Sequence, residues 1–102
     1  MTRTSDIAAL YGRYVLPTYG PASLALVHGD GCRVRDAEGR EYLDFLAGIA
    51  VNAIGHGHPE FVAAVADQAA RLTHVSNLYY NEYQPRLARE LVRRADMDGR
   101  VF

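Results

Sequence analysis

The sequence predicts an α+β fold, in which an N-terminal helix and two later helices accompany a small antiparallel sheet. Three observations carry this prediction. Residues 24–43 alternate apolar and polar side chains between glycine-containing turns, residues 59–72 repeat apolar side chains at helical spacing, and residues 84–95 do so again. Because strands and helices are segregated along the chain, the pattern favours α+β over a strictly alternating α/β fold.

The first predicted element is a short helix that follows Thr4-Ser5-Asp6. These three residues are of the types found at helix N-caps, and Ile7, Leu10 and Tyr14 then recur on one face. Pro17 ends the pattern because proline cannot continue a helix.

Residues 24–43 predict three strands joined by two turns. The first turn is expected at Gly29-Asp30-Gly31, with Cys32 beginning the second strand. The second turn is expected at residues 36–40, where Gly39 suits a position with positive φ. The result is an antiparallel meander.

The most regular helix pattern begins at Pro59, which suits the first position of a helix. Glu60 lies in its first turn and Arg71 in its last, each on the side that the helix dipole favours. Its apolar stripe consists of Phe61, Val62, Val65, Ala69 and Leu72. A second helix follows over residues 84–95 and is expected to end at Asp98-Gly99.

The last three residues, 100–102, have the pattern of a strand that is just beginning. We interpret this as a hint that residues 1–102 are the N-terminal segment of a longer domain. Without the remainder, part of the apolar surface of the meander and helices is expected to lie uncovered.

Composition excludes several classes of function. Eleven arginines against twelve acidic residues give a net charge of −1 without a block of like charges, which disfavours nucleic acid and anionic membranes. No apolar run approaches the ~18 residues of a membrane span, and residues 1–14 contain no apolar leader core, so a cytoplasmic protein is predicted. One cysteine excludes an internal disulfide. The chain has no lysine, so it cannot complete Schiff-base chemistry by itself.

His56 and His58 stand one residue apart between glycines and before Pro59. An extended pair of this kind can ligate a transition metal, but a zinc site needs three or four ligands and no others occur at a familiar spacing. We therefore favour a tight turn into the following helix and predict no metal site. The glycines near Asp30 likewise lack the spacing and the helix of a phosphate-binding loop.

Three tyrosines, Tyr79, Tyr80 and Tyr83, cluster beside asparagines in the segment between the last two helices. Because the chain has no basic surface, these tyrosines are not expected to stack on nucleic-acid bases. Packing against another chain or domain is the favoured interpretation. From the residues alone, a free-standing interaction domain with a tyrosine-rich contact loop is one interpretation.

Longer stretches of the sequence are more specific. "YGRYVLPTYG", "YLDFLAGIAVNAIGHGHP", "HVSNLYYNE" and "LARELV" occur in the order and spacing typical of one family. From about Tyr11 to Phe102 the chain resembles the N-terminal portion of class III pyridoxal-phosphate-dependent aminotransferases, and within them the acetylornithine aminotransferases.

The resemblance implies the N-terminal part of the minor domain of a fold type I enzyme, usually a homodimer. It implies amino transfer between N-acetylornithine, or a related acylated diamino acid, and 2-oxoglutarate, in arginine biosynthesis. In the family the turn that holds the pyridoxal 5'-phosphate, the aspartate on its ring nitrogen and the Schiff-base lysine all come later than these residues. No catalytic residue is therefore expected in this chain, and the 102 residues alone are predicted to be inactive.

Five positions can be carried over from the resemblance. Tyr19 matches a tyrosine at the substrate entrance of related ornithine aminotransferases, and Ile49 stands where those relatives place a substrate-contacting tyrosine. Without that hydroxyl, Ile49 suits an acylated substrate better than a free amine. Ser76, Asn77 and Tyr79 fall in the segment that runs along the dimer interface near the active site. Simple packing is the alternative role for Tyr19 and Tyr79.

The chain departs from the pattern directly after Tyr19. Acetylornithine enzymes often read T-Y-G-R, whereas this sequence has Pro21 in place of the arginine. If that arginine binds a carboxylate, this chain lacks it, and the preferred acyl substrate is left open.

Overall fold

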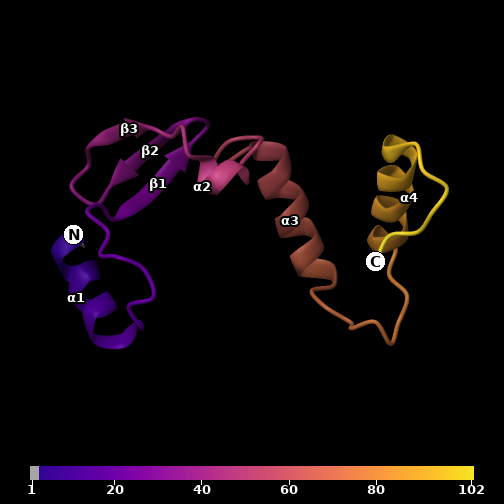
Figure 1. Ribbon diagram of the computed structural model, residues 1–102, viewed down its shortest axis with the longest axis horizontal. Coiled ribbons are helices and arrows are strands. Elements are labelled where there is room, and N and C mark those ends of the chain that lie inside the picture. The colour runs from indigo at the N-terminus through magenta and orange to yellow at the C-terminus, as the bar shows by residue number, and fades with distance from the viewer. Residues whose placement is uncertain (1–2) are drawn as a thin grey trace. The chain divides into compact units, whose positions relative to one another are not determined.

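The structure is a computed structural model that describes residues 3–102. The chain divides into two compact units, Met1–Val65 and Ala66–Phe102. Figure 1 shows the helix–meander–helix–helix order that the sequence predicts, and it adds one short helical turn. Helices together with a small antiparallel sheet make the chain α+β.

Helix α1 spans Thr4–Tyr14 and is capped from two directions. The Arg3 N–H donates to the carboxylate of Asp6 at 3.0 Å. The Thr4 N–H and hydroxyl both donate to the carboxylate of Glu38, at 2.9 and 2.7 Å. Because Glu38 belongs to a hairpin turn of the sheet, this contact ties the start of α1 to the meander.

The sheet consists of β1 (Leu26–Asp30), β2 (Arg33–Asp36) and β3 (Glu41–Leu43), antiparallel in the order β1-β2-β3. Asp30 pairs directly with Arg33, which leaves Gly31 and Cys32 as a two-residue turn. The expectation that Cys32 begins the second strand was therefore wrong. The reason is that Gly31, with φ 52°, supplies the positive φ that such a tight turn requires.

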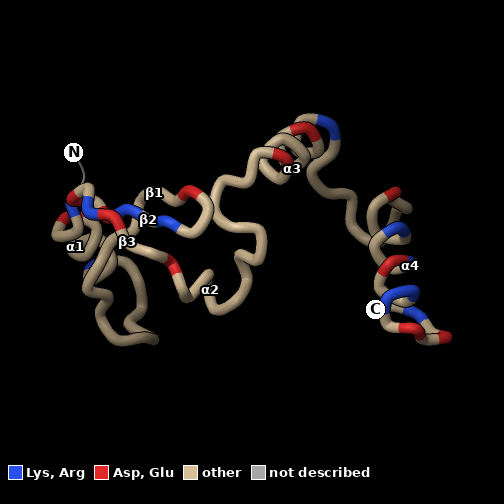
Figure 2. The backbone as a smooth tube through the Cα atoms, turned by 90° about the horizontal axis from the view of Figure 1, so that it is seen from above, with Lys and Arg blue, Asp and Glu red and all other residues tan. Residues whose placement is uncertain are grey.

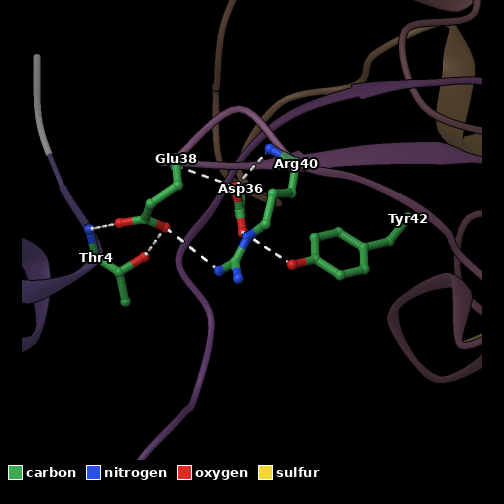
Figure 3. Close-up of polar contacts among 5 residues, drawn as sticks. All are labelled: Thr4, Asp36, Glu38, Arg40 and Tyr42. Carbon is green, nitrogen blue, oxygen red and sulfur yellow. Dashed lines mark hydrogen bonds and ion pairs between the residues drawn. The ribbon is translucent and has the colours of Figure 1, made fainter.

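Asp36 is the most buried residue of the sheet, at 1% exposure, and it organises the second turn (Figure 3). Its carboxylate accepts from the N–H groups of Glu38 and Arg40, from Arg40 Nε and from the Tyr42 hydroxyl, all at 2.8–3.0 Å. Burial acts to raise the pKa of Asp36, but these donors outweigh it and hold the pKa below the ordinary 3.8. The carboxylate is therefore ionised and fully hydrogen-bonded.

Helix α3 spans Pro59–Arg71 and α4 spans Tyr83–Ala95. Helix α3 begins at the predicted proline. Helix α4 ends at Asp96, earlier than the expected Asp98-Gly99, because Asp96 adopts φ 49° and its N–H donates to the carbonyl of Arg93. A short polar side chain tolerates this left-handed cap.

Opposite charges alternate along α4, as Figure 2 shows. Glu82 pairs with Arg86 at 3.1 Å and Glu90 with Arg93 at 2.9 Å, at the spacings of neighbouring helix turns. All four side chains are well exposed, so each pair stabilises the helix only slightly. The strand predicted to begin at residues 100–102 is not formed, since no described segment pairs with it.

Almost no apolar side chain of the described residues is buried. Val34, at 7% exposure, is the single hydrophobic residue below the surface. The helix stripes lie open, with Phe61 57%, Leu87 62% and Leu91 46% exposed. The accessible surface is 9613 Å², against about 5,700 Å² for a compact protein of this mass and about 6,900 Å² for two separate compact units. The uncovered apolar surface expected from the sequence is confirmed.

Candidate functional site

The segment around Ile49 has an unusual backbone. Helix α2 (Ala47–Ala50) is a single left-handed helical turn. The sequence patterns did not predict this element. The φ angles of Ala47, Gly48, Ile49 and Ala50 are 49°, 64°, 64° and 61°. Three of the four carry a side chain, and each such residue costs roughly 1–2 kcal/mol relative to ordinary backbone. Contacts from elsewhere must hold the turn in place.

Asp44 holds the start of this turn. One carboxylate oxygen accepts from the N–H groups of Leu46 and Ala47, at 3.0 and 2.8 Å. The other lies 2.8 Å from Nε2 of His56. The Asp44 N–H donates to the carbonyl of Cys32, which fixes the residue to the sheet. Donation by His56, then by the two backbone N–H groups, lowers the pKa of Asp44 below 3.8.

His56 holds the other side of the turn. Its backbone exchanges two hydrogen bonds of 2.9 Å with Gly31, as an isolated bridge beside the hairpin. Its ring lies against Gly29, where an added Cβ would come within 2.5 Å of the imidazole. At Gly55, which has φ 80°, an added Cβ would lie 3.0 Å from the backbone of Gly31. Glycine is therefore required at both contact points.

The two histidines have separate structural positions. His56 pairs with Asp44, whereas the His58 carbonyl accepts the Val62 N–H as α3 begins. Nδ1 of His58 is buried without a hydrogen-bond partner. In residues 3–102 no group of three or more His, Cys, Asp or Glu residues is arranged to hold a metal ion. The turn-forming interpretation fits this geometry.

A shallow pocket of about 250 Å³ lies beside the left-handed turn. Its lining includes Cys32, Asp44, Ala47, Asn52 and His56. The Asp44–His56 pair faces this space, but both groups are engaged with each other and with the backbone. The contacts of Asp44 and His56 therefore serve to orient the turn.

The predicted substrate-contacting residues are both outward-facing. Tyr19 lies in the connection between α1 and β1 and is 90% exposed. Ile49 lies in α2 and is 79% exposed. They come from separate segments of the first unit. Their exposure leaves both side chains free to contact another molecule, without assigning one.

The predicted interface residues lie between α3 and α4. Ser76 adopts φ 63°, and its hydroxyl accepts the Leu78 N–H at 3.2 Å. Ser76 and Asn77 line one pocket of about 280 Å³, whereas Tyr79 is not among its lining residues and is 69% exposed. Tyr80, beside it, is fully exposed. The structure thus brings two of the three residues together.

The sequence patterns did not predict the roles of Asp44 and Gly29 or the conformation of α2. The role of Asp44 depends on His56, twelve residues away, and no local spacing rule links the two. A glycine inside a strand, as at Gly29, is a known sign of close backbone approach and could have been used.

Comparison with known proteins places the chain in a family. The class-III aminotransferase family model matches residues 14–102. The chain belongs to this family. Acetylornithine aminotransferase of Xylella fastidiosa is 48% identical over all 102 residues, which correspond to 25% of that protein. The succinylornithine transaminase/acetylornithine aminotransferase of Pseudomonas aeruginosa is 51% identical over 92 residues, which are 90% of this chain and 22% of that protein.

Solved structures give the same assignment. N-acetylornithine aminotransferase from Stenotrophomonas maltophilia matches with a TM-score of 0.80 and 41% identity, over 92% of this chain and 24% of that one. Ornithine aminotransferase from Toxoplasma gondii matches with a TM-score of 0.86 and 33% identity, over 96% and 23%. The chain therefore spans about a quarter of the length of these relatives.

Class III aminotransferases depend on pyridoxal 5'-phosphate in general. A lysine amine is the group that bonds to its aldehyde, and the 102 residues contain no lysine. These residues by themselves do not fit the cofactor.

The structure also contains, within residues 3–102, no helix long and apolar enough to cross a membrane.

Proposed function

We propose that these residues are the N-terminal, minor-domain segment of a pyridoxal-phosphate-dependent transaminase that moves an amino group between N-acetylornithine, or a related acylated diamino acid, and 2-oxoglutarate. The observation that carries the proposal is the 48% identity over the whole chain to an acetylornithine aminotransferase. In arginine biosynthesis this reaction attaches the amino group to the acylated precursor of ornithine.

The exposed apolar surface supports the assignment to a larger fold. The stripes of α3 and α4 and the outward face of the meander are of a kind that a domain core normally covers. In the relatives, three quarters of the protein lies outside the matched region. The covering partner in this proposal is the large domain of the same enzyme.

Within this scheme Tyr19 and Ile49 contact the substrate. Ile49 is an exposed apolar side chain on a fixed turn, so it can lie against an acyl group and leaves an ammonium group without a hydrogen-bond partner. Ser76, Asn77 and Tyr79 belong to the interface of a homodimer near the partner's active site. A cytoplasmic location is part of the same proposal.

The test is an amino-transfer assay on the full-length polypeptide that contains these residues, with the cofactor added and 2-oxoglutarate as acceptor. N-acetylornithine and ornithine are compared as donors, with glutamate formation as readout. The proposal predicts a kcat/KM for N-acetylornithine at least about tenfold above that for ornithine. The opposite preference would overturn the substrate assignment, and no transfer from either donor would overturn the proposed reaction.

The variant that tests the role of Ile49 is Ile49→Tyr. It introduces the hydroxyl that the resemblance to ornithine aminotransferases assigns to this position. The ratio of kcat/KM for N-acetylornithine to kcat/KM for ornithine is expected to fall, mainly because kcat/KM for N-acetylornithine decreases. Leu43→Tyr on the sheet is the control and leaves the preference unchanged. The 102-residue chain alone forms no glutamate, because it supplies no lysine.

A further inference from the structure

The left-handed turn α2 is strained at three of its four residues. Ala47, Ile49 and Ala50 each hold a positive φ although each has a Cβ. Within the turn, Leu46 accepts from Ile49 and Ala50 at 2.8 and 3.0 Å. These short-range bonds would form equally well in a right-handed turn. They do not explain why this hand persists.

The contacts at the two ends of the turn come from residues attached to the sheet, Asp44 and His56. Asp44 fixes the N–H groups of Leu46 and Ala47 before the turn, and it is itself bonded to the carbonyl of Cys32. After the turn, the chain returns to the hairpin through the two backbone bonds between His56 and Gly31. The 2.8 Å contact between the Asp44 carboxylate and His56 Nε2 closes the two attachments into one unit.

Asp44 and His56 are also shielded enough to keep this geometry. Their side chains are 15% and 29% exposed, and the His56 ring fills the space above Gly29. Ile49, in contrast, is 79% exposed and receives almost no support from packing. The direction of the Ile49 side chain therefore depends on the backbone of the turn.

We propose that Asp44 and His56 are positioning residues that hold the left-handed turn and thereby aim Ile49 at the substrate. The proposal deepens the proposed function, since the role of Ile49 at the substrate rests on it. The pair touches no reacting atom and acts only through the placement of residues 47–50.

The experiment uses the full-length polypeptide with Asp44→Ala, Asp44→Asn and His56→Gln. Asp44→Ala removes the hydrogen bonds to Leu46 and Ala47 and the contact with His56. Asp44→Asn keeps an oxygen for the two backbone N–H groups. Glu41→Gln is the control, because Glu41 is a sheet carboxylate whose ion pairs with Arg33 and Arg35 are exposed. Donor preference and the KM and kcat for N-acetylornithine are measured, together with the methyl NMR signals of Ile49 and Ile7.

In Asp44→Ala, KM for N-acetylornithine is expected to rise about tenfold with a smaller change in kcat, because a displaced turn weakens binding first. Asp44→Asn and Glu41→Gln stay within about threefold of the unchanged protein. The Ile49 methyl signal moves in Asp44→Ala and in His56→Gln, while that of Ile7 in α1 stays in place.

An unchanged KM and an unmoved Ile49 signal in folded Asp44→Ala would overturn the proposal, as would an equal loss in Asp44→Asn and Asp44→Ala. If Asp44→Ala does not fold, His56→Gln decides by the same two readouts. If the unchanged protein transfers no amino group, the proposed function fails. The Ile49 signal still decides whether Asp44 and His56 hold the turn, so the two failures are distinguishable.

Discussion

The meander and the helices that follow it are stabilised in opposite ways. In residues 26–44 two carboxylates, Asp36 and Asp44, accept seven hydrogen bonds between them from backbone and side chains, with His56 counted among the donors. In α3 and α4 most side-chain contacts are exposed pairs within one helix, and the apolar stripes stay open.

The difference shows for which part of the chain contacts within the chain determine the geometry. The meander positions its polar groups by contacts with other parts of the same unit, so its geometry is specified by residues 3–65. The helices follow local propensity, and their apolar stripes are left largely exposed by the described residues. The proposed substrate-contacting residues Tyr19 and Ile49 lie in the first unit, and the predicted interface residues lie in the second.

Acidification should give the largest effect, because it removes several interactions of the first unit at once. Hydrogen bonds from Thr4 lower the pKa of Glu38 below 4.5, and the pKa values of Asp36 and Asp44 lie below 3.8. A lowered pKa in the folded state means that the stabilisation is complete above the ordinary value and is lost as the pH falls through the lowered one.

The meander is therefore expected to be fully stable above about pH 5 and to unfold cooperatively as the pH falls below 4. Amide NMR signals of residues 33–44, followed from pH 7 to pH 2.5, provide the measurement. Loss of these signals above pH 5, or their retention at pH 2.5, would show that the carboxylates do not stabilise the hairpin.

Asp36→Ala tests the same region at one residue. It leaves the N–H groups of Glu38 and Arg40 and the Tyr42 hydroxyl without their acceptor, and it also opens space at a buried position. The melting temperature of the meander is expected to fall by roughly 10 °C or more. Glu41→Ala, which removes only exposed ion pairs, should change it by less than about 2 °C, and equal effects of both variants would contradict the account.

Gly29→Ala tests the contact between β1 and His56. The new Cβ would lie 2.5 Å from Cγ of the imidazole, so the ring must move away from Asp44. A loss of about 1–3 kcal/mol in the free energy of unfolding is expected from denaturant titration. Gly20→Ala is the matched control, because a Cβ there meets nothing within 4 Å, and it should be neutral.

Ala50→Gly and Ala64→Gly should have opposite effects, although both change alanine to glycine. Ala50 holds φ 61° in α2, so glycine relieves strain there and is expected to stabilise the protein by up to about 1 kcal/mol. Ala64 lies in regular α3, where glycine costs roughly 0.5–1 kcal/mol. Destabilisation by Ala50→Gly, measured by denaturant titration, would show that the turn is not left-handed.

The sequence allowed prediction of those elements whose signals are local. The helix start at Pro59, the hairpin turn at Gly39 and the meander all follow from residue types at fixed spacing, and all three are confirmed. The end of α4 was misplaced by two residues because Asp96, which is not a glycine, adopts the left-handed cap. Helix-capping preferences favour glycine at such a position, so they did not predict that an aspartate would end the helix.

The candidate site was less predictable, for a physical reason. The left-handed turn contains one glycine among four residues, and its hand is selected by Asp44 and His56 from outside the turn. Such a conformation is a tertiary effect that periodicity cannot reveal. Ile49 was found through resemblance to a family, whereas the contact between Asp44 and His56 beside its turn could be found only from the structure.

Hydrogen exchange of the 102-residue chain at neutral pH tests the contrast between the two regions most directly. The account predicts amide protection of at least about 100-fold in β1, β2 and β3, and protection below about tenfold along α4, whose apolar face is uncovered. Equal, strong protection of α4 and the meander would contradict it, because the helices would then be stabilised within the chain itself.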